Sequence, residues 1–174
     1  MKIIFLDIDG VLNVMPPGID EFGSLFHPGI DEFGSLFHPH FEENLREIIE
    51  KTEAKIVISS SWRISGLKFM KDLWSFRNLP GEIIDITTDV WQAAVNYKIE
   101  FLDRCERGHE IQEWLDSHKI TSYVIIDDDS DMLKSQMNNF VRTSNNYHHE
   151  DHVEGYGLTK LCAKQAIQIL NGKV

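Results

Sequence analysis

Two carboxylates follow the first apolar run of the chain. Asp7 and Asp9 come directly after Ile3–Leu6, and Gly10 follows them. Such a run is typical of a buried parallel strand, and ligands of open α/β sheets bind beyond the carboxyl ends of such strands. Glycine allows a sharp turn, which would direct both carboxylates into one small volume. Two crowded anions favour a divalent cation with oxygen ligands, although this segment alone does not exclude a loop without one.

A second group of polar residues follows the apolar run at 54–58. Ser59 and Ser60 end this run, and Arg63 comes three residues later. Hydroxyl groups and exposed backbone amides can donate to a phosphate, and the planar guanidinium group matches two phosphoryl oxygens. We therefore expect Ser59, Ser60 and Arg63 to bind phosphate. The sequence leaves open whether the ring of Trp62 stacks on a nucleobase or packs in the core.

The third group is acidic and follows the apolar run at 122–126. Asp127, Asp128 and Asp129 are adjacent, and Asp131 comes two positions later. A strand that ends in adjacent carboxylates is electrostatically unfavourable without a cation, so a metal site is favoured over an acidic turn exposed to solvent. Because the carboxyl ends of parallel strands share one edge of a sheet, the three groups can build one site.

Hydrophobic patterns predict the elements that position these groups. Apolar residues at helical spacing predict helices at 41–52, 67–74 and 110–117, and a last helix that Thr159 caps. Short apolar runs predict strands at 3–6, 54–59, 82–86, 122–127 and 140–143. Strands that alternate with helices imply a parallel sheet covered on both faces. The predicted fold class is α/β, with a doubly wound, mainly parallel, Rossmann-like sheet.

Length and composition limit the possible functions. The chain has 174 residues, which predicts a single domain over 1–174, and 42% of them are hydrophobic, as in an ordinary globular protein. No apolar stretch reaches membrane-spanning length and Asp7 interrupts the first one early, so we expect a cytoplasmic protein. The formal net charge of −11 argues against a broad nucleic-acid-binding surface but allows a local basic patch. Nothing in the sequence indicates an obligate protein partner.

An 11-residue segment occurs twice in direct succession, at 17–27 and 28–38. The copies are identical, so a recent duplication or an artefact explains them better than two separate packing roles, and one repetition is too little for a solenoid. Each copy carries Gly and Pro, so we expect an extended loop over 17–38, with a flap over the site as the functional alternative. A further polar segment carries three histidines, which we interpret as a solvated loop rather than a second metal site: His148, His149 and His152.

Taken in order, these groups resemble the motifs of the haloacid dehalogenase (HAD) superfamily of phosphohydrolases. The segment 7–10, Asp-Ile-Asp-Gly, is similar to its first motif, and Ser59 to the serine or threonine of its second. More narrowly, the segments 59–63, 107–115 and 126–132 look like the small HAD domains of multidomain RNA-repair proteins. The resemblance extends neither to the duplicated segment nor to the histidine-rich one.

The other two motifs are matched less uniquely. The third is a lysine or arginine ahead of the fourth strand, and Arg107 is favoured over two neighbours, Lys98 and Arg104. The fourth is either a pair of adjacent acids or two acids four residues apart. Asp127 with Asp128 and Asp127 with Asp131 match it equally well.

The resemblance implies a Mg²⁺-dependent phosphomonoesterase. Asp7 would attack phosphorus and form an aspartyl-phosphate, and Asp9 would protonate the leaving oxygen and then activate water. Ser59 and Arg107 would bind the phosphoryl oxygens. Mg²⁺ would be held by the carboxylates of Asp7 and Asp127 and by the backbone carbonyl of Asp9, with Asp128 or Asp131 close by.

The spacing of the motifs bears on the substrate. Neither 10–58 nor 64–106 has room for a separate cap domain, and an uncapped site admits bulky phosphorylated substrates such as nucleotides or nucleic-acid ends. A small-metabolite phosphatase is the alternative. A receiver-like signalling module and a catalytically silent phosphate-binding domain are further alternatives, but Asp9, two residues after Asp7, favours an enzyme that turns over a phosphoenzyme.

Overall fold

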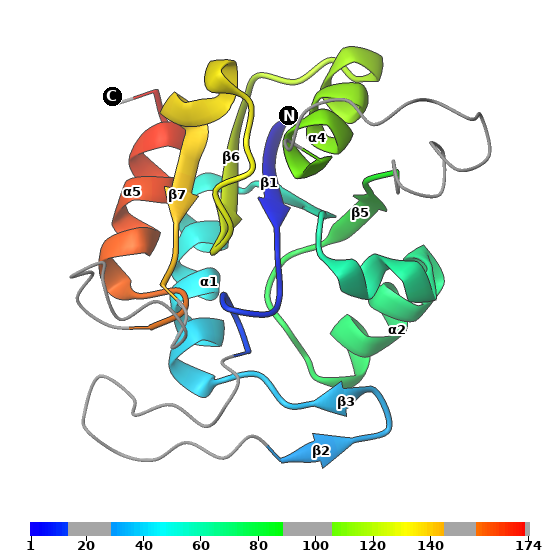
Figure 1. Cartoon of the computed structure of the whole chain (residues 1–174). Coiled ribbons are helices and arrows are strands. Elements are labelled where there is room, and N and C mark those ends of the chain that lie inside the picture. Colours follow the sequence, from blue (N-terminus) through cyan, green and yellow to red (C-terminus); the bar gives the residue numbers. More distant parts are fainter. Residues whose placement is uncertain (14–28, 89–105, 145–155, 173–174) are drawn as a thin grey trace.

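The computed structural model describes residues 1–13, 29–88, 106–144 and 156–172. Within them, five parallel strands form the central sheet in the order β5-β4-β1-β6-β7 (Figure 1). The strands are β1 (Lys2–Leu6), β4 (Lys55–Ile58), β5 (Ile83–Ile86), β6 (Ser122–Asp127) and β7 (Phe140–Arg142). Because β1 pairs with both β4 and β6, the carboxyl ends of these three strands lie next to one another.

Helices cover both faces of this sheet (Figure 1). Three of them pack with one face: α1 (Pro39–Thr52), α2 (Leu67–Phe76) and α5 (Lys160–Leu170). The helix α4 (Glu106–Ser117) packs on the other face. The short 3-10 helices η1 (Ser61–Ser65) and η2 (Lys134–Asn139) lie in the connections that follow β4 and β6. The predicted doubly wound α/β fold is confirmed.

The side chains of β1 divide the core into two clusters, because successive residues of a strand point to opposite faces. Ile4 and Leu6 are fully buried in the cluster that contains α1, α2 and α5. Ile3 and Phe5 are fully buried in the cluster beneath α4, where the ring of Phe5 lies 5.4 Å from that of Trp114. Apolar packing on both faces therefore fixes the end of β1 from which Asp7 follows.

The element boundaries follow the hydrophobic pattern closely, with α4 as the main exception. The helix predicted at 110–117 begins four residues earlier, at Glu106. Its first residues carry no apolar periodicity, so the pattern could not mark this start. Thr159 caps α5 as predicted, since its side chain accepts a hydrogen bond from the Cys162 amide. The earlier start of α4 matters because it brings Arg107 into the first turn of the helix.

The second copy of the repeated segment forms a two-stranded hairpin, which corrects the expectation of an extended loop for this copy. β2 (Ile30–Asp31) and β3 (Gly34–Ser35) pair antiparallel (Figure 1). Arg77, after α2, donates two hydrogen bonds to Asp31, of 2.9 and 2.8 Å, and its guanidinium carbon lies 4.6 Å from the centre of the Phe37 ring. Arg77 thus anchors the hairpin to α2. The first copy, 17–27, lies outside the described residues.

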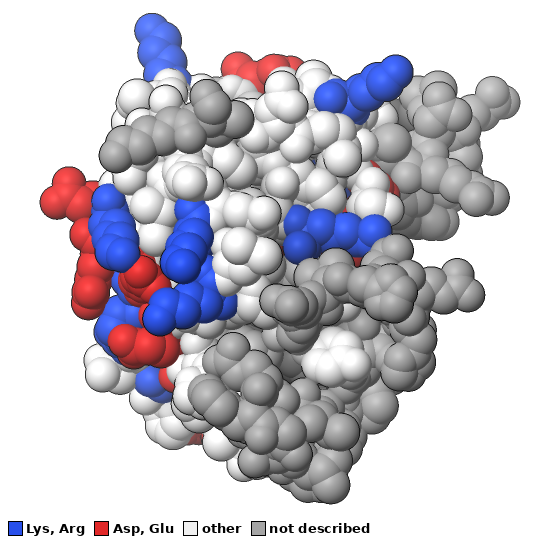
Figure 2. Space-filling view, turned by 90° about the vertical axis from the view of Figure 1, so that its left-hand side faces the viewer, with Lys and Arg blue, Asp and Glu red and all other residues white. Residues whose placement is uncertain are grey.

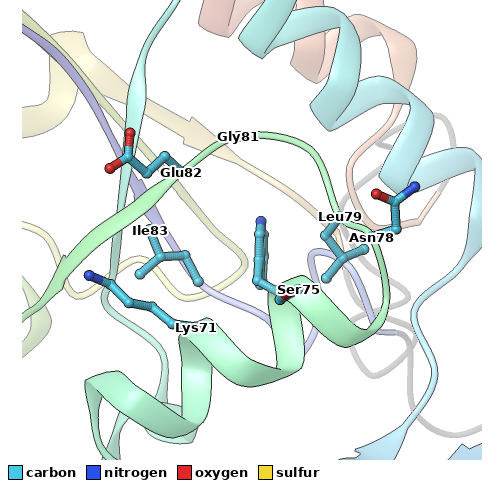
Figure 3. Close-up of a pocket in the computed structure, with 8 residues that line it drawn as sticks. Lys71, Ser75, Asn78, Leu79, Gly81, Glu82 and Ile83 are labelled. Atoms are coloured by element: carbon cyan, nitrogen blue, oxygen red, sulfur yellow. The ribbon is translucent and has the colours of Figure 1, made fainter.

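A hollow of about 360 Å³ opens between the end of α2 and the start of β5 (Figure 3). Its lining includes Lys71, Asn78 and Glu82, but no residue that the sequence suggests for chemistry. The candidate site lies instead at the ends of the central strands. Among the described residues, no helix combines the length and apolar character needed to cross a membrane.

Deletion of one copy tests whether the duplication matters for folding. Because the copies are identical, removal of 17–27 and removal of 28–38 give the same chain, which keeps one segment able to form the hairpin. A shorter loop loses less entropy on closure, about 0.6 kcal/mol for each halving of its length. We expect thermal unfolding followed by circular dichroism to show an unchanged or slightly higher melting temperature.

Arg77→Ala is the contrasting variant, because it removes the anchor of the hairpin in the full chain. Its melting temperature should fall by several degrees, as expected when a largely buried ion pair loses one partner. A single-copy chain that melts far below the full chain would show that both copies contribute to the packed structure.

Candidate active site

The segment after β1 places Asp7 and Asp9 at the carboxyl edge of the sheet. The Asp7 amide donates to the carbonyl of Ile126, so β1 stays paired with β6 one residue beyond the strand. The chain then turns at Gly10, which has a φ of 77°. A Cβ atom at this position would lie between 2.4 and 2.7 Å from atoms of the Asp128 carboxyl group. Only glycine suits both this backbone conformation and this close approach.

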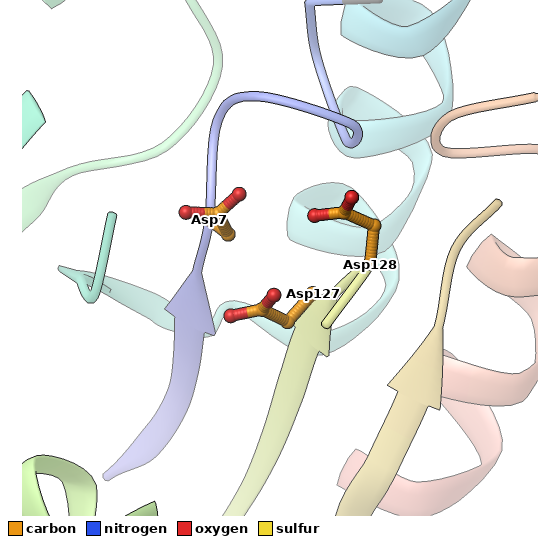
Figure 4. A group of neighbouring side chains, drawn as sticks. All are labelled: Asp7, Asp127 and Asp128. Carbon is orange, nitrogen blue, oxygen red and sulfur yellow. The ribbon is translucent and has the colours of Figure 1, made fainter. Parts of the chain in front are cut away.

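Carboxylates from two neighbouring strands converge at this edge (Figure 4). Asp7 follows β1, Asp127 ends β6 and Asp128 comes next, and one oxygen of each lies within 4.8 Å of the others. Asp7 is 6% exposed and Asp127 is 1% exposed, so water solvates neither charge well. Buried carboxylate oxygens at this spacing suit a hard divalent cation such as Mg²⁺. The donor set thus fits such an ion, with Asp128 as the third carboxylate.

Arg107 supplies a positive charge beside these carboxylates. Its Nη1 lies 3.2 Å from Oδ1 of Asp7 and 3.4 Å from Oδ2 of Asp127, and it also donates to the carbonyl of Ser59. Burial alone would lower the pKa of Arg107, but Asp127 and Asp7 raise it, so the side chain stays a cation. The two alternatives for this position, Lys98 and Arg104, lie outside the described residues.

Burial makes the ionisation of the two innermost carboxylates unfavourable. It is the largest influence on Asp7 and raises its pKa from 3.8 to about 6, although the charge of Arg107 and a hydrogen bond from Ser60 lower it. Burial, and then the charge of Asp7, raise the pKa of Asp127 well above its usual range. A bound cation would favour the ionised forms and offset this penalty.

Ser59 and Ser60 follow β4 and are fully buried beside the end of β1. The Ser59 amide donates to the carbonyl of Leu6, which holds the two strand ends together. Ser59 Oγ has no hydrogen-bond partner among the described residues, and an unpartnered buried hydroxyl group costs about 1–3 kcal/mol. A phosphoryl oxygen would supply this partner, in line with the role expected for Ser59.

Arg63, which we expect to bind phosphate, lies buried between the loop of Ser59 and Ser60 and α4. The side chain is 8% exposed, and its Nη1 donates to the carbonyls of Ser59 and Ser60, both at 2.9 Å. Its Nη2 pairs with Glu110 of α4 at 2.6 Å. A buried guanidinium group requires such partners to replace its hydration. Arg63 therefore holds the segment of Ser59 and Ser60, the serine loop, against α4.

Of the two acids that match the fourth motif equally well, Asp128 belongs to the carboxylate cluster, and Asp131 lies at the start of α4. Its Oδ2 accepts a hydrogen bond from the Arg107 amide at 3.2 Å, and its carbonyl accepts one from the Gly108 amide at 3.2 Å. The first amides of a helix have no partner within the helix and attract carboxylates. Asp131 therefore fixes the start of α4, and with it the backbone from which Arg107 extends.

Asp9 is exposed and lies outside the carboxylate cluster. Its Oδ1 accepts a hydrogen bond from Asn13 Nδ2 at 3.0 Å, and its Oδ2 accepts one from Trp62 Nε1 at 2.9 Å. The ring of Trp62 packs against Phe37, with the ring centres 5.8 Å apart. Of the two interpretations of Trp62, the structure shows packing. Neither contact follows from the hydrophobic pattern, although Asn13 lies only four residues after Asp9.

The last residue of β7 and the residue that follows it complete this edge, and neither is among the residues that the sequence suggests for the site. Arg142 ends β7 and donates to the carbonyl of Asp128 at 3.1 Å. The hydroxyl group of Thr143 donates to the carbonyl of Gly10 at 2.8 Å. Their position at the end of a predicted strand is the signal that could have suggested them.

The three histidines of the polar segment lie outside the described residues: His148, His149 and His152.

The raised pKa values predict how the stability of the metal-free protein depends on pH. Between the ordinary value of 3.8 for Asp7 and its folded value of about 6, the folded state binds more protons than the unfolded state. This contribution to stability is fully present below about pH 4 and is lost as the pH rises through about 6. Urea unfolding in EDTA should give a larger free energy of unfolding at about pH 5 than at about pH 7.5.

Asp7→Asn should reduce this dependence on pH, because an amide does not titrate. The matched control is Asp129→Asn, which changes an exposed neighbour of the cluster and should keep the parental slope. Equal slopes for the parent and Asp7→Asn would contradict the assignment of the raised pKa to Asp7.

A comparison with protein families matches residues 3–148 to the HAD domain in Swiss Army Knife RNA repair proteins. The matched stretch extends from β1 to β7 and contains the acidic cluster, the serine loop and Arg107. No curated protein and no solved structure matches the chain. Because the match covers most of the chain, the protein belongs to the family of HAD domains of Swiss Army Knife RNA repair proteins.

Proposed function

We propose that the protein is a Mg²⁺-dependent phosphomonoester hydrolase that forms an aspartyl-phosphate intermediate. Membership of the HAD family supports a phosphohydrolase. The observation that carries the proposal is the convergence of Asp7, Asp127 and Asp128 beside Arg107. A transferring phosphoryl group carries negative charge throughout the reaction, so fixed positive charge and metal-binding carboxylates around one reacting position suit it.

Asp7 is the proposed nucleophile. One of its carboxylate oxygens bonds to phosphorus while the bond from phosphorus to the leaving oxygen breaks, and Asp9 gives its proton to that oxygen. Water then attacks the phosphorus of the aspartyl-phosphate, the bond to Asp7 breaks, and Asp9 takes a proton from the water. The two carboxylates suit these different roles, because Asp7 is buried at a rigid strand end and Asp9 is exposed.

The other residues of the site are proposed to hold the phosphoryl oxygens. Ser59 Oγ would donate one hydrogen bond and Arg107 would add a charge, already fixed by its contacts with Asp7 and Asp127. Mg²⁺ bound to the carboxylate cluster would supply further positive charge at these oxygens. Preorganised groups of this kind stabilise the transition state without rearranging during the reaction.

A phosphorylated nucleic-acid end or nucleotide is the proposed substrate. The family to which the chain belongs is described from RNA repair proteins, which supports this class. Between β1 and β4, the described residues contain only the hairpin and α1 as regular elements, and these do not amount to a cap domain. A small metabolite is the alternative, because the net charge of −11 disfavours a polyanion.

The distribution of charge limits how nucleic acid would bind. On the side where α5 lies, lysine and arginine side chains gather beside acidic ones (Figure 2). Glu47 of α1 illustrates the mixture: a hydrogen bond from Lys51 lowers its pKa most, and Lys160 and Lys164 of α5 add smaller effects. A mixed surface of this kind attracts phosphates weakly and loses that attraction as salt rises. Recognition would then depend on the terminal phosphate in the site.

Asp7→Asn tests the nucleophile and should abolish turnover of 4-nitrophenyl phosphate. The change keeps the volume and removes the attacking oxygen, so the loss should reach several orders of magnitude while the melting temperature stays near or above the parental value. Activity within about tenfold of the parent would exclude Asp7 as the nucleophile. Asp129→Asn is the control and should keep the parental rate.

Asp9→Asn and metal removal test the rest of the mechanism. Asp9→Asn spares the nucleophile but removes the proton carrier, so a phosphoenzyme should accumulate and be detectable by mass spectrometry after acid quenching. EDTA should abolish turnover and Mg²⁺ should restore it. Full activity in excess EDTA would contradict the proposed metal.

The substrate class can be tested by a direct comparison of kcat/KM. We expect an oligonucleotide with a terminal phosphate, preferably at the 3′ end, to exceed glucose 6-phosphate at low salt, and its advantage to shrink at moderate salt because phosphate contacts are screened. A preference for the sugar phosphate at both salt concentrations would support the small-metabolite alternative.

A further inference from the structure

The carboxylate of Asp9 is held by donors that restrict where its proton can point. Trp62 Nε1 lies 2.9 Å from Oδ2, and Asn13 Nδ2 lies 3.0 Å from Oδ1. An indole nitrogen can donate but cannot accept, whereas an amide side chain carries both kinds of group. A proton on Asp9 can therefore form no hydrogen bond with Trp62. It must be directed elsewhere, and Trp62 is the neighbour that enforces this.

Trp62 is itself fixed by the start of η1. Its amide lies 3.4 Å from Ser60 Oγ, which caps this short helix. The next residue, Arg63, is tied to Glu110 of α4 by an ion pair of 2.6 Å between largely buried side chains. The backbone of Trp62 is therefore held on both sides, so its indole nitrogen keeps a defined position relative to Asp9.

The second repeat copy packs against the indole ring of Trp62, through the hairpin and through Phe37, which follows it. Phe37 is 3% exposed and its ring centre lies 5.8 Å from that of Trp62. A Cβ atom on Gly34 of β3 would lie 3.6 Å from Cη2 of Trp62, which places the hairpin backbone against the same ring. Arg77 lies over the ring of Phe37 and binds Asp31, so both Phe37 and the hairpin are anchored to α2.

We infer that Trp62 is a positioning residue for Asp9 and that the hairpin of the second repeat copy supports it. The inference rests on the proposed function, in which Asp9 protonates the leaving oxygen and later takes a proton from water. The indole N–H occupies one lone pair of Oδ2 and orients the carboxyl group. The proton of Asp9 then faces the leaving oxygen in the first step, and a free lone pair faces the water in the second.

The test compares two substrates of similar shape that differ in their need for a proton. Phenyl phosphate releases a more basic oxygen than 4-nitrophenyl phosphate, so its kcat/KM depends more on a well-placed general acid. Trp62→Phe keeps an aromatic ring and removes the N–H. We expect it to lower kcat/KM for phenyl phosphate at least about tenfold more than for 4-nitrophenyl phosphate, since general acids contribute about 100-fold or more.

Trp114→Phe is the matched control. The indole Nε1 of Trp114 also donates to a carboxylate, Oδ2 of Asp85 at 2.7 Å, but it lies in the cluster beneath α4. This variant should keep the parental ratio of the two kcat/KM values. Phe37→Leu is the second test variant, because it leaves the indole N–H in place and weakens the packing of the second repeat copy against the indole ring. The ratio of the two kcat/KM values should shift in the same direction as in Trp62→Phe, by a smaller factor.

The outcomes separate this inference from the proposed function. A parental enzyme that turns over both substrates, with an unchanged ratio in Trp62→Phe, would overturn the role of Trp62 alone. An unchanged ratio in Phe37→Leu would overturn the role of the hairpin, and this variant also decides the case if Trp62→Phe fails to fold. A parent that hydrolyses neither substrate would overturn both proposals.

Discussion

The burial of two adjacent carboxylates at the end of the sheet is the constraint on which the rest of the site depends. Asp7 and Asp127 follow neighbouring strands, so the pairing of β1 with β6 brings them together whatever their charges. Burial raises the pKa of both carboxyl groups, and the charge of Asp7 raises that of Asp127 further, because like charges are poorly screened away from water. A protein that keeps both carboxylates ionised must place positive charge beside them, and the guanidinium group of Arg107 supplies part of that charge.

The position of Arg107 in turn depends on interactions between protein groups that hold α4 in place. Asp131 fixes the first amides of α4, and Glu110 ties the same helix to the serine loop through Arg63. A buried ion pair adds little net stability, because the desolvation of both charges offsets their attraction. Its value here is geometric: each such pair removes one freedom of movement between α4 and the ends of β1 and β4. Charged residues thus act as much on the backbone as on the reacting group.

The sequence predicts those parts of the structure that depend on local pattern. The strands ending at Leu6 and Asp127 follow from runs of apolar residues, and their parallel arrangement follows from the alternation with helices. The meeting of Asp7 and Asp127 could be predicted because parallel strands share an edge. The protein partners of Arg63 and Asp131 could not be predicted, because they are fixed by tertiary contacts that no periodicity reports.

The fourth motif shows the same limit at a finer scale. Asp128 and Asp131 match the motif equally well as residue types and spacing, and only geometry separates them. The φ of 77° at Gly10 and the absence of a Cβ atom there let the Asp128 carboxyl group pack against the turn after β1, which keeps it near Asp7. Asp131 is already bound to the start of α4. The glycine of the first motif therefore helps to place Asp128 in the carboxylate cluster.

The second copy of the repeated segment is joined directly to α1. The second copy ends at His38, which caps α1, and the His38 amide donates to the carbonyl of Leu12 at 2.9 Å. The equivalent residue of the first copy, His27, is followed in the sequence by Pro28 and Gly29, whereas Pro39 and His40, which follow His38, begin α1. The covalent connection to α1 therefore fixes where the second copy ends. A role for the hairpin behind Trp62 would therefore belong to a position in the chain, and the residues of either copy can fill it once they are joined to α1.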